Sequence, residues 1–271
     1  MSAQWNTAFA SVIGTSHEKT GTSCQDACHC RIIQASDGQE IFLGIVSDGA
    51  GSASRSEVGS TLVVQMFLDK FGTLIKSEKD MHLINRNFVL DWLEEVRAQI
   101  FIRATKEALS PREFACTILG AIVGLNNSIF FQIGDGAIVV SETPLDEYYC
   151  IFWPQHGEFA NQTNFITQEN LSEILEFESS QGSVNRITLF TDGIERLVLD
   201  FSDRSVYPPA LNSIFEWLQN NQQVNPDEKS SSVLFNYLNS SFINSRTDDD
   251  KSLVMATRAT KEKPHVSTEI S

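Results

Sequence analysis

Aspartates recur beside apolar, often β-branched runs at four places in this chain. Three of them follow such a run, and the fourth is a triplet of aspartates that precedes one. The four positions are Asp48, Asp135, Asp192 and residues 248–250. The apolar runs predict buried strands. Strand ends that each present one carboxylate can meet in space although they are far apart in sequence.

A cluster of carboxylates can bind only certain ligands. Several carboxylates held close together repel one another unless a cation lies between them. Oxygen ligands suit hard divalent ions such as Mg²⁺ and Mn²⁺. A glycine beside three of the aspartates allows a sharp turn or a close backbone approach. Because Asp-Gly is also a common surface turn, it is the recurrence at strand ends that predicts a metal-assisted hydrolase.

Length and composition predict one large domain. The chain has 271 residues, of which 41% are hydrophobic, enough for a sizeable core. We expect this domain to span residues 1–258 and a polar, disordered tail to span residues 259–271. No stretch approaches the roughly 20 apolar residues that span a membrane. The five cysteines and the lack of a secretory signal favour reduced thiols and a cytoplasmic location.

The formal net charge of −15 limits the class of partner. It argues against nucleic acid and against an anionic membrane surface, because both require clustered Lys and Arg. A bound divalent metal reverses the charge locally, so phosphorylated substrates remain compatible with this composition. We expect a monomer.

Hydrophobic periodicity predicts an α+β fold in which sheets are covered by helices. We predict strands over residues 5–13, 30–35, 41–47, 115–125, 129–133, 137–141, 148–152, 186–191 and 251–257. We predict helices over residues 56–75, 87–109, 208–220 and 227–242. Residues 154–182 are polar and predict a long irregular loop. Within it, residues 157–165 form either an Ω-loop packed by its two Phe residues or a lid that helps to choose substrate.

The ordered set of motifs resembles the protein phosphatase 2C family, and within it the small bacterial branch. The match covers about residues 8–257, and it consists of Cys24–Ala27, Val46–Ser52, Ala115–Ile118, Ile133–Gly136, Phe190–Ile194 and Asp248–Leu253. The resemblance implies a four-layer α-β-β-α sandwich of two mixed or antiparallel sheets flanked by helices. It also implies a serine/threonine phosphoprotein phosphatase that uses Mn²⁺ or Mg²⁺ and attacks phosphate monoesters with metal-bound water or hydroxide.

The resemblance assigns roles to individual residues. Asp48 matches the aspartate that bridges two metals, and Gly49 matches the glycine whose carbonyl binds one of them. Asp192 and Asp249 match the late aspartates on the other metal, with Asp249 chosen over its two neighbours by its distance from the following strand. Asp135 matches the ligand of a weaker third metal. The catalytic residue Asp26 matches the early aspartate that orders metal-bound water.

Three positions depart from the family pattern. Gln25 stands where the family often has a metal-binding Glu, and Ala50 replaces a histidine proposed as general acid. The phosphate-holding Arg would fall near Gly21, where the sequence has no cation. We expect His17 to be catalytic in its place, by holding phosphate or by protonating the leaving group; an exposed loop residue is the alternative. Lys19 and Arg55 are weaker candidates.

The departures leave a second function open. The alternative to a phosphatase is a catalytically weak relative that acts as a phosphoprotein-binding or scaffold module, and a third option is a phosphatase of small metabolites. As partners we expect a phosphorylated protein and a cognate Ser/Thr kinase. A zinc site formed by Cys24, Cys28, His29 and Cys30 is disfavoured, because the spacing is too tight for the usual tetrahedral cluster.

Overall fold

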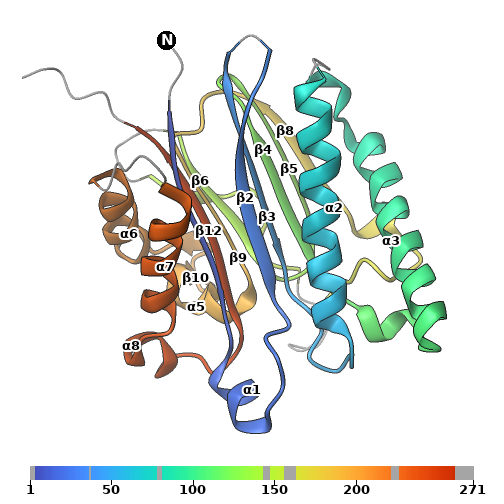
Figure 1. Cartoon of the computed structure of the whole chain (residues 1–271). Helices are drawn as coiled ribbons and strands as arrows, with labels where there is room; N and C mark the ends of the chain where they lie inside the picture. Colours follow the sequence, from blue (N-terminus) through green and yellow to red (C-terminus); the bar gives the residue numbers. More distant parts are fainter. Residues whose placement is uncertain are drawn as a thin grey trace, which may run out of the picture.

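Two five-stranded sheets lie face to face between two layers of helices (Figure 1). The computed structural model describes residues 4–36, 38–77, 81–142, 147–155, 163–220 and 226–259, without the side chains of residues 226–230. The predicted α+β, four-layer sandwich is therefore confirmed. Every strand pairing among the described residues is antiparallel.

The first sheet joins the two ends of the described chain. In spatial order it contains β1 (Trp5–Val12), β12 (Lys251–Arg258), β9 (Arg186–Phe190), β6 (Ala137–Ser141) and β7 (Tyr149–Cys150). The second sheet contains β2 (Ala27–Gln34), β3 (Glu40–Ser47), β4 (Ile118–Val123), β5 (Asn127–Ile133) and β8 (Glu176–Gln181). A small hairpin pairs β10 (Leu199–Asp200) with β11 (Ser205–Val206).

Long helices cover the outer face of each sheet (Figure 1). The second sheet is covered by α2 (Ser56–Lys76) and α3 (Arg86–Glu107), and the first by α6 (Pro208–Asn220) and α7 (Pro226–Leu238). The short helices are α1 (Thr15–Thr20), α4 (Leu171–Ile174), α5 (Glu195–Val198) and α8 (Ser241–Asn244). The 3₁₀ turns are η1 (Met81–Leu83), η2 (Pro111–Phe114) and η3 (Asp192–Ile194).

Strand β3 shows how the sequence produces the layers. Successive side chains of a strand point to opposite faces. Accordingly, Leu43 and Ile45 belong to the cluster under α2 and α3. Phe42 and Val46 belong to the cluster between the two sheets. A strand that is buried on both faces carries a near-continuous apolar run, which is why the sequence identified it.

Helix α2 is long and apolar enough to cross a membrane by length and composition alone. In the fold, 56% of its most apolar window is buried. Val63, Phe67 and Phe71 lie in the cluster against the second sheet. Burial in a protein core accounts for this hydropathy.

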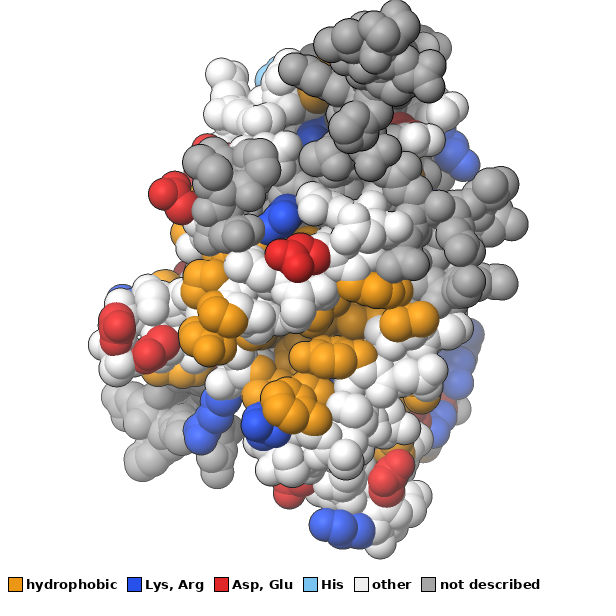
Figure 2. All heavy atoms as spheres, turned by 90° about the vertical axis from the view of Figure 1, so that its left-hand side faces the viewer, with side chains coloured by type: hydrophobic (Ala, Val, Ile, Leu, Met, Phe, Trp, Pro, Cys, Tyr) orange, Lys and Arg blue, Asp and Glu red, His pale blue; other side chains and the backbone are white. Residues whose placement is uncertain are grey.

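The opposite face of the molecule exposes hydrophobic side chains. Figure 2 shows them gathered across the middle of the side formed by α6, α7 and α8. Tyr207 is 57% exposed and Phe242 is 56% exposed, and both line a groove that also contains Ile194 and Arg246. Beneath the groove, Leu211 and Leu253 belong to the core between this helical layer and the first sheet.

The prediction of an irregular loop over residues 154–182 is wrong in its second half. That segment contains α4 and then β8, which pairs with β5 and completes the second sheet. Strand β8 has the sequence Glu-Phe-Glu-Ser-Ser-Gln and lies at the edge of the sheet. Its polar side chains are tolerated at an edge, so the apolar signal of a strand is missing. Residues 156–162 and the tail residues 260–271 lie outside the described residues.

The aromatic cluster under α3 yields a stability prediction. Trp92 is 1% exposed. Its ring centroid lies 5.1 Å from that of Phe71 and 5.8 Å from that of Phe131. Trp92→Ala should lower the free energy of unfolding by about 3–5 kcal/mol, because it removes buried area and leaves a cavity. Ile102→Ala on the same helix, at a side chain 47% exposed, should change it by less than about 0.5 kcal/mol. Urea denaturation measures both changes, and equal losses would contradict this account of the core.

Candidate active site

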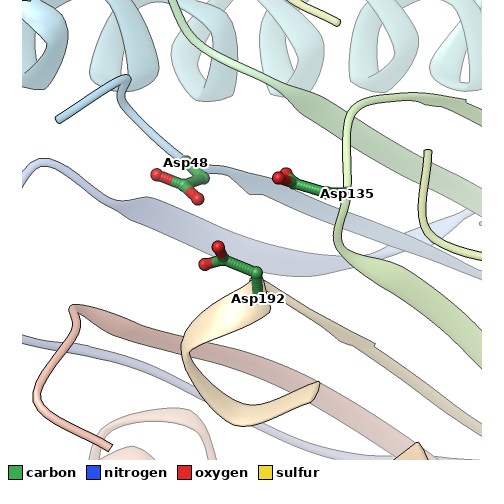
Figure 3. Close-up of side chains that lie close together, drawn as sticks. All are labelled: Asp48, Asp135 and Asp192. Atoms are coloured by element: carbon green, nitrogen blue, oxygen red, sulfur yellow. The ribbon is translucent and has the colours of Figure 1, made fainter. Parts of the chain in front are cut away.

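Three of the aspartates named from the sequence meet at one end of the sandwich. Asp48 follows β3, Asp135 lies in the turn between β5 and β6, and Asp192 begins η3 directly after β9. One carboxylate oxygen of each lies within 4.8 Å of the others. In Figure 3 the three side chains point toward a common space, from segments that belong to both sheets. The convergence expected from strand ends is therefore present.

Burial and mutual repulsion perturb these carboxylates strongly. Burial is the first cause that raises the pKa of Asp48 well above its usual range, and the charges of Asp26 and Asp192 add to it. Burial raises the pKa of Asp192 to about 7, reinforced by the charges of Asp135 and Asp249. Burial also raises the pKa of Asp135. A divalent cation would relieve all of these costs at once, and the all-oxygen donor set fits Mn²⁺ or Mg²⁺.

Asp26 belongs to the same charged cluster. Its side chain is buried, and its Oδ2 accepts a hydrogen bond of 2.8 Å from the hydroxyl of Thr191. Thr191 Oγ1 in turn accepts from the backbone N–H of Ser252 at 3.0 Å. Burial raises the pKa of Asp26, the Thr191 hydrogen bond opposes that rise, and the nearby charges of Asp250 and Asp192 reinforce it. Asp26 is thus fixed beside Asp48 and Asp192 rather than exposed on a loop.

Two neighbouring residues of the aspartate triplet, Asp249 and Asp250, have different surroundings. The carboxylate of Asp250 is engaged by protein atoms: Oδ1 accepts from the N–H of Gly14 and Oδ2 from the N–H of Gln25, both at 2.6 Å. Asp249, by contrast, contributes to the charge that raises the pKa values of Asp48 and Asp192. Asp249 is not among the three side chains spaced to bind one ion, so its assignment as a ligand stays a prediction.

Close backbone packing around the cluster explains two of the glycines. A Cβ atom on Gly49 would lie 2.5 Å from the carbonyl oxygen of Gln25. A Cβ atom on Gly193 would lie 1.8 Å from the carbonyl oxygen of Asp250. Glycine is therefore required at both positions because another segment of the site passes close to its Cα.

A buried lysine holds the backbone of the triplet. Lys251 Nζ donates hydrogen bonds to the carbonyl oxygens of Asp249 at 3.3 Å and Ile13 at 3.4 Å, and to Asn244 Oδ1 at 3.0 Å. Burial lowers the pKa of Lys251, while the charge of Asp250 opposes that change. The lysine thereby connects the start of β12 to the segment that follows β1.

His17 reaches the aspartate triplet through Asp250. It is part of α1, and its Nδ1 pairs with Asp250 Oδ1 at 3.0 Å. Its side chain is 19% exposed, so the structure does not bear out a fully exposed loop residue. Since Nδ1 faces Asp250, any contact of the ring with phosphate would have to be made by Nε2.

The other two candidate cations are less well placed. Arg55 pairs with Glu57 at 3.1 Å and with Glu107 at 2.8 Å, which disfavours it as a free phosphate ligand. Lys19 lies on α1 with an exposed side chain.

Gln25 is buried, and its Nε2 donates a hydrogen bond of 3.4 Å to the carbonyl oxygen of Ala53, so its amide is part of the packed site.

The cysteine-rich segment has a structural role. Cys28 and Cys30 lie on β2 and pack against the core between the sheets, as expected for alternate residues of a strand. Within the described ranges, the group of side chains spaced to bind a metal is the aspartate cluster and includes no cysteine. The zinc interpretation is accordingly not supported.

Sequence reasoning missed three participants in this site. Thr191 and Glu195 flank the Asp192 motif, and Asp250 was set aside in favour of Asp249. Burial raises the pKa of Glu195 to about 7, and the charges of Asp192 and Asp135 add to the rise. Thr191 was detectable as the residue before Asp192, whereas the partners of Asp250 lie more than 200 positions away and leave no local pattern.

Comparison with known proteins places this chain in a family. The family model described as protein phosphatase 2C matches residues 13–234. The chain is 35% identical over 259 residues to serine/threonine-protein phosphatase 3 of Escherichia coli strain K12, which covers 93% of this chain and 98% of the relative. The chain belongs to the protein phosphatase 2C family. The resemblance inferred from the motifs is confirmed.

Solved structures agree on the fold of this family. The serine/threonine phosphatase Stp1 of Staphylococcus aureus is 16% identical, with a TM-score of 0.63 over 96% of this chain and 97% of that chain. The catalytic domain of serine/threonine protein phosphatase PstP, solved with two manganese ions, is 15% identical, with a TM-score of 0.61 over 94% of this chain and 99% of that chain. At such identities the likeness concerns the arrangement of the sheets and helices.

The raised carboxylate pKa values predict how stability depends on pH in the metal-free protein. The pKa of Asp192 rises from 3.8 to about 7, so between these values the folded chain binds more protons than the unfolded chain. The free energy of unfolding should therefore be highest near pH 4 with respect to this group and fall as pH rises toward 7. Asp192→Asn should flatten the fall. Thermal unfolding in EDTA across this range measures it, and an identical pH profile in wild type and variant would contradict the assignment.

Proposed function

We propose that the protein is a metal-dependent phosphatase that hydrolyses phosphoserine and phosphothreonine in proteins, with Mn²⁺ or Mg²⁺ as cofactor. The meeting of Asp48, Asp135 and Asp192 in a chain of the protein phosphatase 2C family is the observation that carries this function. The Escherichia coli relative is named a serine/threonine-protein phosphatase, and the PstP catalytic domain was solved with two manganese ions. Both names support the same activity and cofactor here.

We assign the ions to the carboxylate cluster. Asp48 and the Gly49 carbonyl, together with Asp192 and Asp249, would hold two ions, and Asp135 would hold a weaker third. When bound, the ions lower the pKa of coordinated water and offset the negative charge of a phosphate monoester. Two hydrogen bonds hold Asp26 in place. Thr191 donates to the carboxylate of Asp26, and Asp250 accepts from the backbone N–H of Gln25, the residue before Asp26.

The same geometry favours an enzyme over a scaffold protein. Gln25, Ala50 and the missing Arg near Gly21 are the reasons for considering a catalytically weak phosphoprotein-binding module. The carboxylates are nevertheless gathered and buried, with raised pKa values that a bound divalent cation would lower. A module that only recognised phosphate would gain nothing from burying so many like charges, because they repel the ligand.

Further features of the cellular role are also part of this proposal. We infer a cytoplasmic monomer that acts in signalling, takes a phosphorylated protein as substrate and opposes a cognate Ser/Thr kinase. The net charge of −15 supports a partner other than nucleic acid or an anionic membrane. The odd number of cysteines, five, supports a reducing compartment.

Metal dependence tests the function directly. A phosphothreonine peptide should be dephosphorylated with Mn²⁺, lose all turnover in EDTA and recover it when Mn²⁺ is restored. Asp48→Asn should reduce kcat to background and remain folded, because removing one buried charge relieves repulsion in the metal-free state. Phosphate release measures turnover and circular dichroism measures folding. Peptide binding without turnover would favour the scaffold function, and full activity in EDTA would exclude the metal mechanism.

The role of His17 can be separated by substrate. Its Nδ1 is engaged by Asp250, and we propose that Nε2 holds phosphate or protonates the leaving group. His17→Ala should lower kcat/KM for a phosphopeptide about 100-fold, the lower end of general acid–base effects. An acid role predicts a smaller loss for p-nitrophenyl phosphate, whose leaving group needs no proton. A phosphate-binding role predicts equal losses. Unchanged kinetics on both substrates would assign His17 to structure alone.

A further inference from the structure

The turn that contains Asp135 is held by two hydrogen bonds with Gln155, a residue about 20 positions further along the chain. Gly134, the residue before Asp135, has a φ of +126°, a conformation that L side chains rarely adopt. Its N–H donates a hydrogen bond of 2.9 Å to Gln155 Oε1, and its carbonyl oxygen accepts one of 3.1 Å from the Gln155 backbone N–H. Gln155 therefore binds both polar groups of the residue that precedes the proposed ligand.

A second glutamine supports the same turn from inside the sheet. Gln132 on β5 is fully buried, and its Nε2 donates to the carbonyl oxygens of Gly134 at 3.1 Å and Gly136 at 2.9 Å. These contacts fix the two residues that flank Asp135. Gln132 lies on β5, the strand that leads into the turn. Gln155 comes from a different segment, so its contacts link the turn to another part of the fold.

The other side of Gln155 faces the edge of the second sheet. Its Nε2 donates to the carbonyl oxygen of Ile174, at the end of α4, at 2.8 Å, and to Glu176 Oε2, at the start of β8, at 3.1 Å. Asn164 Nδ2 donates to Gln155 Oε1 at 3.1 Å. One amide side chain thus connects the Asp135 turn to α4 and β8, the part of the fold that the sequence failed to reveal.

We propose that Gln155 is a positioning residue for Asp135, which fixes the turn through Gly134 and ties it to the start of β8, so that the affinity of the Asp135-dependent ion depends on this connection. The inference rests on the proposed function of the cluster as a divalent-ion site. Gln155 itself lies outside the set of ligands proposed above, and it acts only through the backbone of the turn.

The physical reason is the precision that a metal ligand requires. A carboxylate contributes to ion binding only where its oxygens are already placed, because ordering it on binding costs free energy. Glycine has wide conformational freedom, so outside contacts are needed to hold Gly134 in this one conformation. Gln155 supplies an acceptor to the peptide unit before the Gly134 Cα and a donor to the peptide unit after it, which restricts the rotation of both units about that Cα.

The test compares two glutamines that differ in location. Gln155→Met removes the amide with little change in volume. Gln219→Met is the matched control, because Gln219 is also half-buried and hydrogen-bonded, to Thr257 and Arg186, but lies on α6. Mn²⁺ affinities are measured by isothermal titration, and the Mn²⁺ concentration for half-maximal phosphopeptide hydrolysis is measured in parallel.

We expect Gln155→Met to weaken the lowest-affinity Mn²⁺ event and to raise the half-activating Mn²⁺ concentration by about 10–100-fold, as for other residues that orient metal ligands. At saturating Mn²⁺, kcat should stay within about twofold of wild type, because excess ion compensates for lost affinity. Gln219→Met should leave both ion measurements unchanged. Equal Mn²⁺ affinities in the two variants would overturn the proposal, whatever their melting temperatures.

A double-mutant cycle and a swapped pair keep the proposal testable if Gln155→Met folds poorly. In an Asp135→Asn background, Gln155→Met should cause no further loss of Mn²⁺ affinity, since the ligand it positions is already gone. Gln155→Glu keeps an acceptor for Gly134 but places a carboxylate against Glu176, and adding Glu176→Gln should restore part of the lost affinity. Additive losses, or no restoration, would reject the connection.

The titration also separates this inference from the proposed function. If wild type binds Mn²⁺ but hydrolyses no phosphopeptide, the phosphatase function fails while the affinities still decide the role of Gln155. If wild type hydrolyses phosphopeptide and Gln155→Met retains wild-type Mn²⁺ affinity, the function stands and the positioning role is rejected.

Discussion

Repulsion between buried carboxylates is the constraint on which the rest of this structure depends. Burial raises the pKa values of Asp26, Asp48, Asp135, Asp192 and Asp249, and the charges of neighbouring carboxylates add to each rise. Such an arrangement persists only if the surrounding fold is stiff enough to resist it. The two sheets supply that stiffness, because each aspartate lies next to the end of a strand whose side chains are closely packed. Ion binding then completes an arrangement that the fold has already imposed.

Contacts that bridge distant segments hold the site against this repulsion. Asp250 accepts hydrogen bonds from the N–H groups of Gly14 and Gln25. Lys251 donates hydrogen bonds to three oxygen acceptors around the start of β12. Gln155 does the same for the Asp135 turn. In each case one buried or half-buried polar side chain satisfies several backbone groups at once, and a backbone segment is immobilised. The ligands can therefore be presented without direct contacts of their own to a large protein surface.

The sequence predicted what is local and missed what is not. Asp48, Asp135 and Asp192 were found because strand, aspartate and glycine are adjacent in the chain, and β3 was found because both of its faces are buried. Strand β8 was missed because an edge strand can be polar, and α1 because six residues carry too little periodicity. The offset from β12 was the basis for choosing Asp249 over Asp250, and that choice stays a prediction; the contacts of Asp250 with Gly14 and Gln25 had no local signal in the sequence. Gln155 belongs to no motif, since its partners are brought to it only by the completed fold.

The order of the first sheet has a consequence for how the chain is made. Strand β1 lies at the edge and pairs with β12, so residues 5–12 find their partners at residues 251–258. The same closure brings Asp250 to the segment that contains Gln25 and Asp26. During synthesis the first strand must wait for almost the whole chain to emerge before it can pair. Pairings of such high sequence separation are slow to form. A chain that stops before β12 has an incomplete sheet and an incomplete site, so activity begins only once synthesis has reached the last strand.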